Sequence, residues 1–438
     1  MRWAVVGAGS AGCVVAARLS ERADEEVTLY EAGPDLTPAE AAALGGPDAM
    51  ATADAPGRTV ADLVARRVTG GAALPYRRGR GVGGSSVVNA MVGVRGDPAQ
   101  YERWGWTDVE AAWQRVQLPT EPAAPGEIGP LARALLAVDP RATTLPLTRR
   151  DGRRVTSAEA YLWGATDRPN LTVRTDVEVT AIELDDRRAT GLHLRSGGVD
   201  GFEPADAVVL CAGAIHTPEL LLRSGVEVPG VGEHLQDHPS VAITVELADA
   251  GRRRPDQLSV STVLDAGRWQ VLPIDAAADG TGRYGLLLCA VMQPSGRAGT
   301  VRLGERSVEV ELRLLDDPGD RRLLRRAVDA ALDLLEHRAF ADLVVDAFAD
   351  EHGTPAGGLR DDDAFERWLP TAAGGYVHAS SSCAMGVVVD GDGRLHGHEG
   401  IYLCDASVFP EVPSVHPHLP VTMLAERLVA RWRRAGAR

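Results

Sequence analysis

The chain has 438 residues, of which 45% are hydrophobic and 24% charged, and its formal net charge is −15. A chain of this length exceeds a single hydrophobic core, so we expect two closely joined domains of a soluble globular protein. The negative charge argues against a nucleic-acid surface. All 46 basic residues are arginine, which excludes the chemistry of a Schiff-base lysine or a P-loop lysine.

The cysteines and the apolar runs indicate where in the cell the protein is expected. Five cysteines are scattered without CxxC spacing, and their odd number is typical of reduced thiols in the cytosol. No apolar run approaches the roughly eighteen residues that a membrane-spanning helix requires. We therefore predict a cytoplasmic protein with no transmembrane segment, no disulfide framework and no metal centre.

Residues 1–33 carry the pattern of a dinucleotide site. An apolar run ends at Val6 and leads into the glycine-rich segment 7–12, and a second apolar run, 27–30, ends at Glu31. Such glycines permit a tight strand-to-helix turn, a close approach of backbone to pyrophosphate, and packing of the helix on the strand, while Glu31 can accept ribose hydroxyls. The predicted nucleotide contacts are Gly7, Gly9, Ser10, Ala11, Gly12, Glu31 and Ala32.

The middle of the chain predicts further elements of the same sheet. A short helix is expected at 60–67, a glycine-serine loop at 78–89 leads into a helix, and 100–116 is expected to be helical. The β-branched runs 171–175 and 177–184 predict strands. Two further strands, 191–194 and 207–210, are expected to return to the nucleotide-binding sheet, so the first domain is discontinuous.

A second domain is predicted from the β-like segments 240–247, 284–292 and 307–315. The alternation of apolar and charged residues in the last of these suits a sheet that is wet on one face. Apolar residues recur at helical spacing over 320–337, which predicts a helix that covers the other face. The end of the chain then returns to a strand at 401–404 and a final helix from about 421 to 433.

Two histidines stand in unusual contexts. His378 opens the segment His-Ala-Ser-Ser-Ser-Cys-Ala-Met-Gly, and His418 lies in His-Pro-His-Leu-Pro ahead of the last helix; neither segment reads as core. Imidazole can take a proton from an alcohol at neutral pH, and a second imidazole can orient that alcohol. The alternative is that each is a hydrogen-bonded loop residue. His216, His234 and His238 have no metal-ligand spacing and are interpreted as structural.

Two other segments leave alternatives open. Asp405, at the end of an apolar strand, either hydrogen-bonds the ribityl or phosphate region of a cofactor or caps the turn that follows. The loop 83–86 either cradles a phosphate or forms a flexible turn.

Six motifs in order resemble the glucose-methanol-choline (GMC) oxidoreductases, a family of FAD-dependent alcohol oxidases and dehydrogenases. Beside the nucleotide fingerprint, the matching segments are 78–91 with 94–98, 168–173, 212–225, 230–239 and 405–410. The resemblance covers most of the chain.

The resemblance implies an α/β fold with α+β elements and FAD as cofactor. It implies a Rossmann-like FAD-binding domain of residues 1–239 and 371–438, and an antiparallel-sheet substrate domain of residues 240–370. His378 matches the family's catalytic histidine and His418 its partner, so we expect the two imidazoles to converge opposite the flavin. The further FAD contacts that it implies are Gly83, Ser85, Asn89, Ala90, Val179, Ala212, Gly213, Asp405 and Ala406.

The implied reaction is deprotonation of an alcohol with hydride transfer to flavin N5. Val88 stands where some relatives carry a histidine joined to FAD, so the cofactor is expected to be non-covalent. The chain is also short before Arg77 and between 240 and 320, which indicates a more open pocket. We expect a small-molecule alcohol as substrate, which in an open pocket can be bulky, and oxygen, a quinone or a redox protein remains open as electron acceptor.

Two alternative functions stay open from the sequence. One is a flavoprotein that reoxidises a redox carrier such as mycofactocin and passes electrons to a respiratory acceptor. The other is a non-redox lyase that keeps FAD as a structural group.

Overall fold

The nucleotide-binding core is a five-stranded parallel sheet. The structure is a computed structural model that describes residues 1–277, 281–296, 298–305 and 307–434. The predicted βαβ unit is present as β1 (Arg2–Val6), α1 (Ser10–Leu19) and β2 (Glu26–Tyr30). The strand order is β10-β2-β1-β14-β23, and every pairing is parallel. The other strands are β10 (Leu171–Arg174), β14 (Ala207–Leu210) and β23 (Ile401–Leu403).

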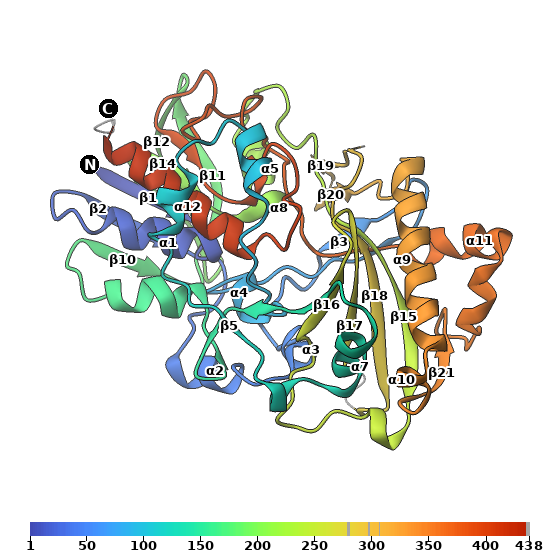
Figure 1. The fold of residues 1–438 in the computed structure, drawn as a ribbon. Coiled ribbons are helices and arrows are strands. Elements are labelled where there is room, and N and C mark those ends of the chain that lie inside the picture. The colour runs from blue at the N-terminus through green and yellow to red at the C-terminus, as the bar shows by residue number, and fades with distance from the viewer. Residues whose placement is uncertain (278–280, 297, 306, 435–438) are drawn as a thin grey trace.

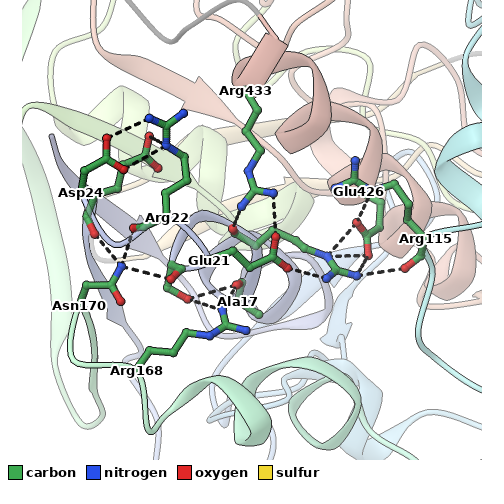
Figure 2. A network of polar contacts seen from close by, with 12 residues as sticks. Ala17, Glu21, Arg22, Asp24, Arg115, Arg168, Asn170, Glu426 and Arg433 are labelled. Atoms are coloured by element: carbon green, nitrogen blue, oxygen red, sulfur yellow. Dashed lines mark hydrogen bonds and ion pairs between the residues drawn. The ribbon is translucent and has the colours of Figure 1, made fainter.

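The C-terminal helix α12 (His418–Arg434) packs against α1, so the end of the chain lies beside its beginning (Figure 1). It begins three residues before the predicted start, and Pro420 lies in its first turn, where a missing N–H costs nothing. Trp432 stacks on Trp3 of β1 with ring centroids 6.2 Å apart. The fully buried Glu426 carboxylate pairs with Arg18 at 2.8 Å and with Arg115 at 3.3 Å (Figure 2).

A separate three-stranded antiparallel sheet follows β10. It consists of β11 (Glu178–Asp185), β12 (Arg188–Ser196) and β13 (Val199–Pro204). The prediction that 191–194 returns to the nucleotide-binding sheet is therefore wrong. Asp186 adopts a positive φ of 53° in a tight turn, so β12 pairs with its immediate neighbour β11.

A seven-stranded sheet forms the second layer of the molecule. Its order is β21-β15-β18-β17-β16-β6, with β22 also paired to β15. The members are β15 (Pro239–Leu247), β16 (Thr262–Asp265), β17 (Trp269–Ile274), β18 (Tyr284–Val291), β21 (Val344–Phe348), β6 (Ala142–Thr144) and β22 (Gly374–Gly375). The sheet thus draws β6 and β22 from outside 240–370.

Helices cover one face of this sheet (Figure 1). The predicted helix is present as α9 (Pro318–Glu336), which contacts β15, β17 and β18 beside α10 (Arg338–Ala341) and α11 (Asp362–Ala372). The opposite face is not exposed to solvent, in contrast to the prediction of one solvent-exposed face for this domain's sheet. Alternate residues of β17 and β18 pack there against Met91, Val92 and Tyr376. Tyr376 places this second face next to the predicted histidine site.

A smaller four-stranded sheet corrects two further predictions. Its order is β19 (Thr300–Leu303), β20 (Val308–Glu311), β3 (Val64–Arg66) and β4 (Ala73–Pro75). The helix predicted at 60–67 is wrong, because β3 pairs with β4 across a turn that contains Gly70 and Gly71. The strand predicted at 307–315 ends at Glu311, but its alternation holds: Val308 and Val310 are buried while Glu309 is exposed.

The predicted helix at 100–116 is divided into α5 (Pro98–Arg103) and α6 (Val109–Trp113), with Gly105 at a φ of +73° between them. Other helices are α2 (Pro38–Ala43), α3 (Ala49–Thr52), α4 (Ser85–Val88), α7 (Pro130–Val138) and α8 (Gly213–Arg223). Two short strand pairs are β5 (Glu121–Pro122) with β7 (Pro146–Leu147) and β8 (Arg149–Arg150) with β9 (Arg153–Arg154). Among the described residues, no helix combines the length and apolar character needed to cross a membrane.

Candidate active site

The glycines between β1 and α1 differ in why, or whether, a larger residue would clash at their positions. Gly7 has a φ of +97°, and a Cβ there would lie 2.7 Å from the carbonyl oxygen of Cys211. A Cβ on Gly12 would lie 1.8 Å from the carbonyl oxygen of Gly7, so only glycine lets α1 pack this closely on the strand. A Cβ on Gly9, in contrast, would meet nothing within 4 Å.

The start of α1 is suited to an anion. Gly9 is the N-cap, and no side chain caps the helix. Ser10 and Ala11 follow in the first turn, where amide groups have no partner within the helix and the dipole favours negative charge. Open space beside Gly9 and an uncapped helix together fit a pyrophosphate.

The second glycine loop lies directly against this turn. Gly83 donates its N–H to the carbonyl of Ala8 at 2.8 Å, and a Cβ on Gly84 would lie 2.7 Å from Cα of Gly9. Ser85 starts α4 and accepts a hydrogen bond from the N–H of Gly79 at 3.1 Å. The structure thus brings together the two glycine segments that the sequence suggested separately, and their approach favours the cradle over a flexible turn.

Glu31 lies where three backbone segments meet. Its carboxylate accepts hydrogen bonds from the N–H groups of Ala8 at 2.8 Å, Gly33 at 2.9 Å and Gly81 at 3.0 Å. Three of about four acceptor sites are therefore used, which leaves one for a ribose hydroxyl. The sequence suggested the ribose contact and missed that this carboxylate also fixes the loops.

Two other predicted contacts lie beside Glu31. The carbonyl of Ala32 accepts a hydrogen bond from Arg80 at 2.6 Å. Val177 donates its N–H to the carbonyl of Glu31 at 3.0 Å, which brings the start of β11, and with it Val179, to the end of β2.

Asp405 fixes a second turn at the carboxyl end of the parallel sheet. The buried carboxylate accepts hydrogen bonds from the N–H of Gly213 at 2.8 Å, the hydroxyl of Thr217 at 2.6 Å and the N–H of Ser407 at 2.8 Å. Ala212 is the N-cap of α8 and Gly213 its first residue, at a φ of +83°. Of the two roles left open for Asp405, the cap is present, and it joins the start of α8 to the turn 405–408.

Asn89 connects the glycine loop to the start of α12. Its Nδ2 lies 3.1 Å from Nδ1 of His418, and its Oδ1 accepts a hydrogen bond from Arg154 at 2.7 Å. Because an amide nitrogen only donates, His418 Nδ1 accepts, and its Nε2–H faces the hydroxyl of Ser157 at 3.2 Å. Burial and the nearby Arg154 lower the pKa of His418 to about 4. Ala90, the next residue, packs against the hydrophobic cluster of Met91, Val92 and Tyr376 on the second face of the seven-stranded sheet.

His378 lies among other aromatic rings. Its ring centroid is 4.6 Å from Tyr376, 5.0 Å from His416 and 5.1 Å from His238. Burial and the charges of the neighbouring groups hold the pKa of His378 well below its ordinary value. An imidazole that stays neutral can act as a base.

The neighbour of His378 in the segment 416–418 is His416, not His418 as we expected. His416 is buried and its pKa is lowered to about 3, chiefly by burial and also by His238. The two histidines flank Pro417, and their side chains contact different parts of the site. The alternating pattern His-Pro-His was visible in the sequence, but nothing in it showed which imidazole faces His378.

The segment after His378 is core, which corrects the sequence interpretation. Ser380, Ser381, Ser382 and Cys383 are fully buried. The N–H of Ser381 donates to the carbonyl of Ala406 at 2.9 Å, and Cys383 donates to Ser407 at 2.8 Å. These bonds hold the histidine segment alongside the Asp405 turn.

The side-chain atoms of Asp237, His238 and His378 lie within 4.8 Å of one another, a spacing that a metal ion would also need. Hydrogen bonds within the protein already engage them. Asp237 accepts from the hydroxyl of Tyr76 at 2.7 Å and from the N–H of His378 at 2.9 Å, and the two imidazoles face each other. The cluster is thus a hydrogen-bond network that carries His378.

Family models of the GMC oxidoreductases match most of the chain. The N-terminal model matches residues 1–120 and 141–240, and the C-terminal model matches residues 294–425. A GMC-type oxidoreductase of Rhodococcus erythropolis is 30% identical over 97% of both chains. An oxygen-dependent choline dehydrogenase of Paraburkholderia xenovorans is 28% identical over 98% of this chain and 93% of the relative. That alignment extends over 542 positions, more than the 438 residues here, so the relative carries insertions that this chain lacks.

Solved structures agree with this assignment. Pyridoxine 4-oxidase from Mesorbium loti superposes with a TM-score of 0.87 at 25% identity and covers 99% of both chains. A formate oxidase of Aspergillus oryzae has the same fold, with a TM-score of 0.87 at 19% identity over 99% of this chain and 98% of that one. The predicted family, α/β fold class and enzyme class are confirmed. The chain belongs to the GMC oxidoreductase family and is an FAD-dependent oxidoreductase acting on CH–OH groups.

Proposed function

We propose that the protein oxidises a small-molecule alcohol to a carbonyl compound, with His378 as the base that takes the hydroxyl proton. The observation that carries the proposal is the position of a neutral imidazole beside Tyr376 and His416, on a segment bonded to the turn 405–408. That turn matches a flavin contact of the family. A base next to a hydride acceptor suffices for alcohol oxidation.

FAD would be held without a covalent bond. The uncapped start of α1 and the open side of Gly9 fit its pyrophosphate, and the remaining lone pair of Glu31 fits a ribose hydroxyl. Val179 would meet the adenine, and the Asn89 and Asp405 segments would lie along the ring and ribityl region. When bound, FAD supplies the acceptor for the hydride. Val88, at the position of the covalent histidine of some relatives, offers no atom for such a bond.

The two other imidazoles would have different tasks. His416 is the ring neighbour of His378 and would orient the substrate hydroxyl toward it. His418 would act through Asn89, because its two nitrogens face Asn89 and Ser157. We therefore assign the direct substrate contact to His416 and a supporting role to His418.

Anaerobic mixing of the purified holoenzyme with a panel of alcohols tests the function. Choline and pyridoxine belong in the panel because similar proteins are named for them. We expect at least one alcohol to bleach the absorbance of the oxidised flavin as the carbonyl product forms. Product formed while the flavin stays oxidised would instead support the lyase, and bleaching only by a reduced redox carrier would support the carrier-oxidising alternative. Repeating the active reaction with air and with artificial acceptors then identifies the acceptor class.

A further inference from the structure

We propose that His238 is a positioning residue that fixes the tautomer of His378 and leaves the Nε2 of His378 free to act as the base. This inference rests on the proposed role of His378. His238 is fully buried immediately before β15, where its side chain faces the backbone of Pro413 and Met292 and the ring of His378. Those contacts determine where the protons of both rings lie.

The first contact sets the proton of His238. Its Nε2 lies 3.0 Å from the backbone carbonyl oxygen of Pro413. A carbonyl oxygen only accepts, so Nε2 carries the proton. Burial lowers the pKa of His238 to about 4, so the ring is neutral near pH 7 and its Nδ1 carries a lone pair.

The second contact transfers this constraint to His378. The Nδ1 atoms of His238 and His378 are 2.9 Å apart, and the rings are nearly perpendicular at 88°. Because Nδ1 of His238 accepts, Nδ1 of His378 must donate. The neutral His378 therefore has a bare Nε2, which is the atom that can take a proton from the substrate hydroxyl.

Neighbouring groups fix the positions of His238 and His378 relative to each other. One carboxylate oxygen of Asp237 accepts the backbone N–H of both His238, at 2.7 Å, and His378, at 2.9 Å. Tyr76 donates to the other oxygen at 2.7 Å. Tyr376, His416 and Arg78 are the other titratable or charged groups near His378. When the substrate proton moves to Nε2, the Nδ1–H of His378 still points at His238, so the imidazolium keeps its hydrogen bond.

The direct test is ¹⁵N NMR of the histidine-labelled holoenzyme, in which the two ring nitrogens of a neutral imidazole resonate far apart according to which one is protonated. The signals of His378 are assigned as those lost in His378→Ala. We expect the form protonated at Nδ1 in the wild type. A His378 ring protonated at Nε2 at neutral pH would overturn the inference whatever the activity.

Two variants at one position separate positioning from packing. In His238→Asn the amide oxygen stands near the place of Nδ1 and can still accept, whereas His238→Leu has a similar volume and cannot. We expect His238→Leu to slow flavin reduction by about 10–100-fold with little change in the substrate KM, and to give a mixture of His378 tautomers. His238→Asn should retain the Nδ1-protonated form and a rate within about threefold of the wild type.

The outcomes distinguish the two proposals. Equal rates and unchanged His378 signals in His238→Leu would overturn the positioning role. An equal loss in both variants, with the His378 tautomer unchanged, would show a packing effect and overturn it as well. If His378→Ala reduces its flavin at the wild-type rate, the proposed base role of His378 fails, while the tautomer of His378 still reports on His238.

Discussion

At the residue scale, the main property of the site is a set of imidazoles that burial keeps neutral. Burial lowers the pKa of His416 to about 3 and of His238 and His418 to about 4, and it moves the pKa of His378 in the same direction. A base works in its neutral form, so a lowered pKa extends its working range toward acid.

The rate of flavin reduction at saturating alcohol should therefore be nearly constant from about pH 9 to pH 6 and fall only well below 6.5, the ordinary pKa of histidine. Stopped-flow reduction across that range measures it. A rate that declines with an apparent pKa of 6.5 or higher contradicts a base that is neutral in this range.

Glu31 gives a second prediction at this scale. Glu31→Ala leaves three backbone N–H groups without their acceptor and removes the ribose contact. Because hydrogen bonds to charged groups each contribute about 1.5–3 kcal/mol, we expect FAD affinity to fall at least about tenfold. The flavin-to-protein absorbance ratio after purification measures the loss. Glu26→Ala, an exposed site on the same strand, is the control and should keep its flavin; full occupancy in Glu31→Ala would refute the assignment.

Single residues show where sequence reasoning ends. The roles of Gly7 and Gly12 follow from chain geometry alone, and the structure supplies the same reasons. His416 and His238 were missed because their importance depends on which rings they face, and local sequence carries no information on contacts between separate segments of the chain. The serines after His378 misled for a related reason: polar side chains suggest exposure, but these three are buried and bonded to backbone groups of several segments, Ser381 to the Asp405 turn.

At the element scale, α1 and α12 depend on one buried carboxylate. The Glu426 side chain is fully buried between Arg18 and Arg115, whereas Glu21, the other carboxylate on Arg18, is one-third exposed. Removing one partner of a buried pair leaves the other charges uncompensated.

Glu426→Ala should therefore lower the free energy of unfolding by about 3–5 kcal/mol. Glu21→Ala removes a more exposed partner of the same arginine and should cost about 0–1 kcal/mol. Urea unfolding of the two variants and the wild type gives the comparison. Equal losses would show that the burial of Glu426 has no energetic consequence.

A buried aspartate at the start of α7 predicts a pH effect. Asp275 accepts hydrogen bonds from the N–H groups of Leu131 at 2.7 Å and Ala132 at 3.3 Å, and burial raises its pKa to about 7. A raised carboxyl pKa means that folding is favoured below the unfolded value near 3.9, and that this contribution is lost as pH rises to 7.

Asp275→Asn removes the titration. The amide NH2 of the new asparagine faces the backbone N–H of Leu131 or Ala132, where a carboxylate oxygen accepted a hydrogen bond. This lowers the stability of the variant by an amount that does not depend on pH. The stability of the variant relative to the wild type should rise between pH 4 and pH 7, by up to about 1.4 kcal/mol per unit, and level off above. Denaturant unfolding at several pH values measures the difference. A pH-independent difference would mean that Asp275 keeps an ordinary pKa.

Elements with strong periodicity were predictable, and those decided by pairing were not. The βαβ unit and α9 follow from apolar spacing, and both are present. The segment 60–67 has no such signal and becomes a strand only because β4 and β20 lie beside it. Likewise β12 has the composition of a sheet strand, but its tight turn joins it to β11 and not to the parallel sheet.

At the scale of the whole molecule, the site forms where two sheets meet. The parallel sheet supplies the glycine turn, Glu31 and the Asp405 turn, and His238 lies immediately before β15 of the large antiparallel sheet. The segment 374–383 joins them, because β22 pairs with β15 and the backbone N–H groups of Ser381 and Cys383 donate to the turn 405–408. The family resemblance predicted from ordered motifs that the histidine segments meet the nucleotide site; the apolar patterns alone predicted the two sheets but not that they share a site.

The central claim is that the imidazole of His378 takes the proton of the alcohol as the flavin is reduced. The measurement that tests it most directly is the anaerobic rate of flavin reduction in His378→Ala, with FAD content matched to the wild type and the best alcohol from the panel. The account predicts full FAD binding and a rate lower by about 100-fold or more, the usual scale for a removed general base. Reduction at the wild-type rate would contradict it.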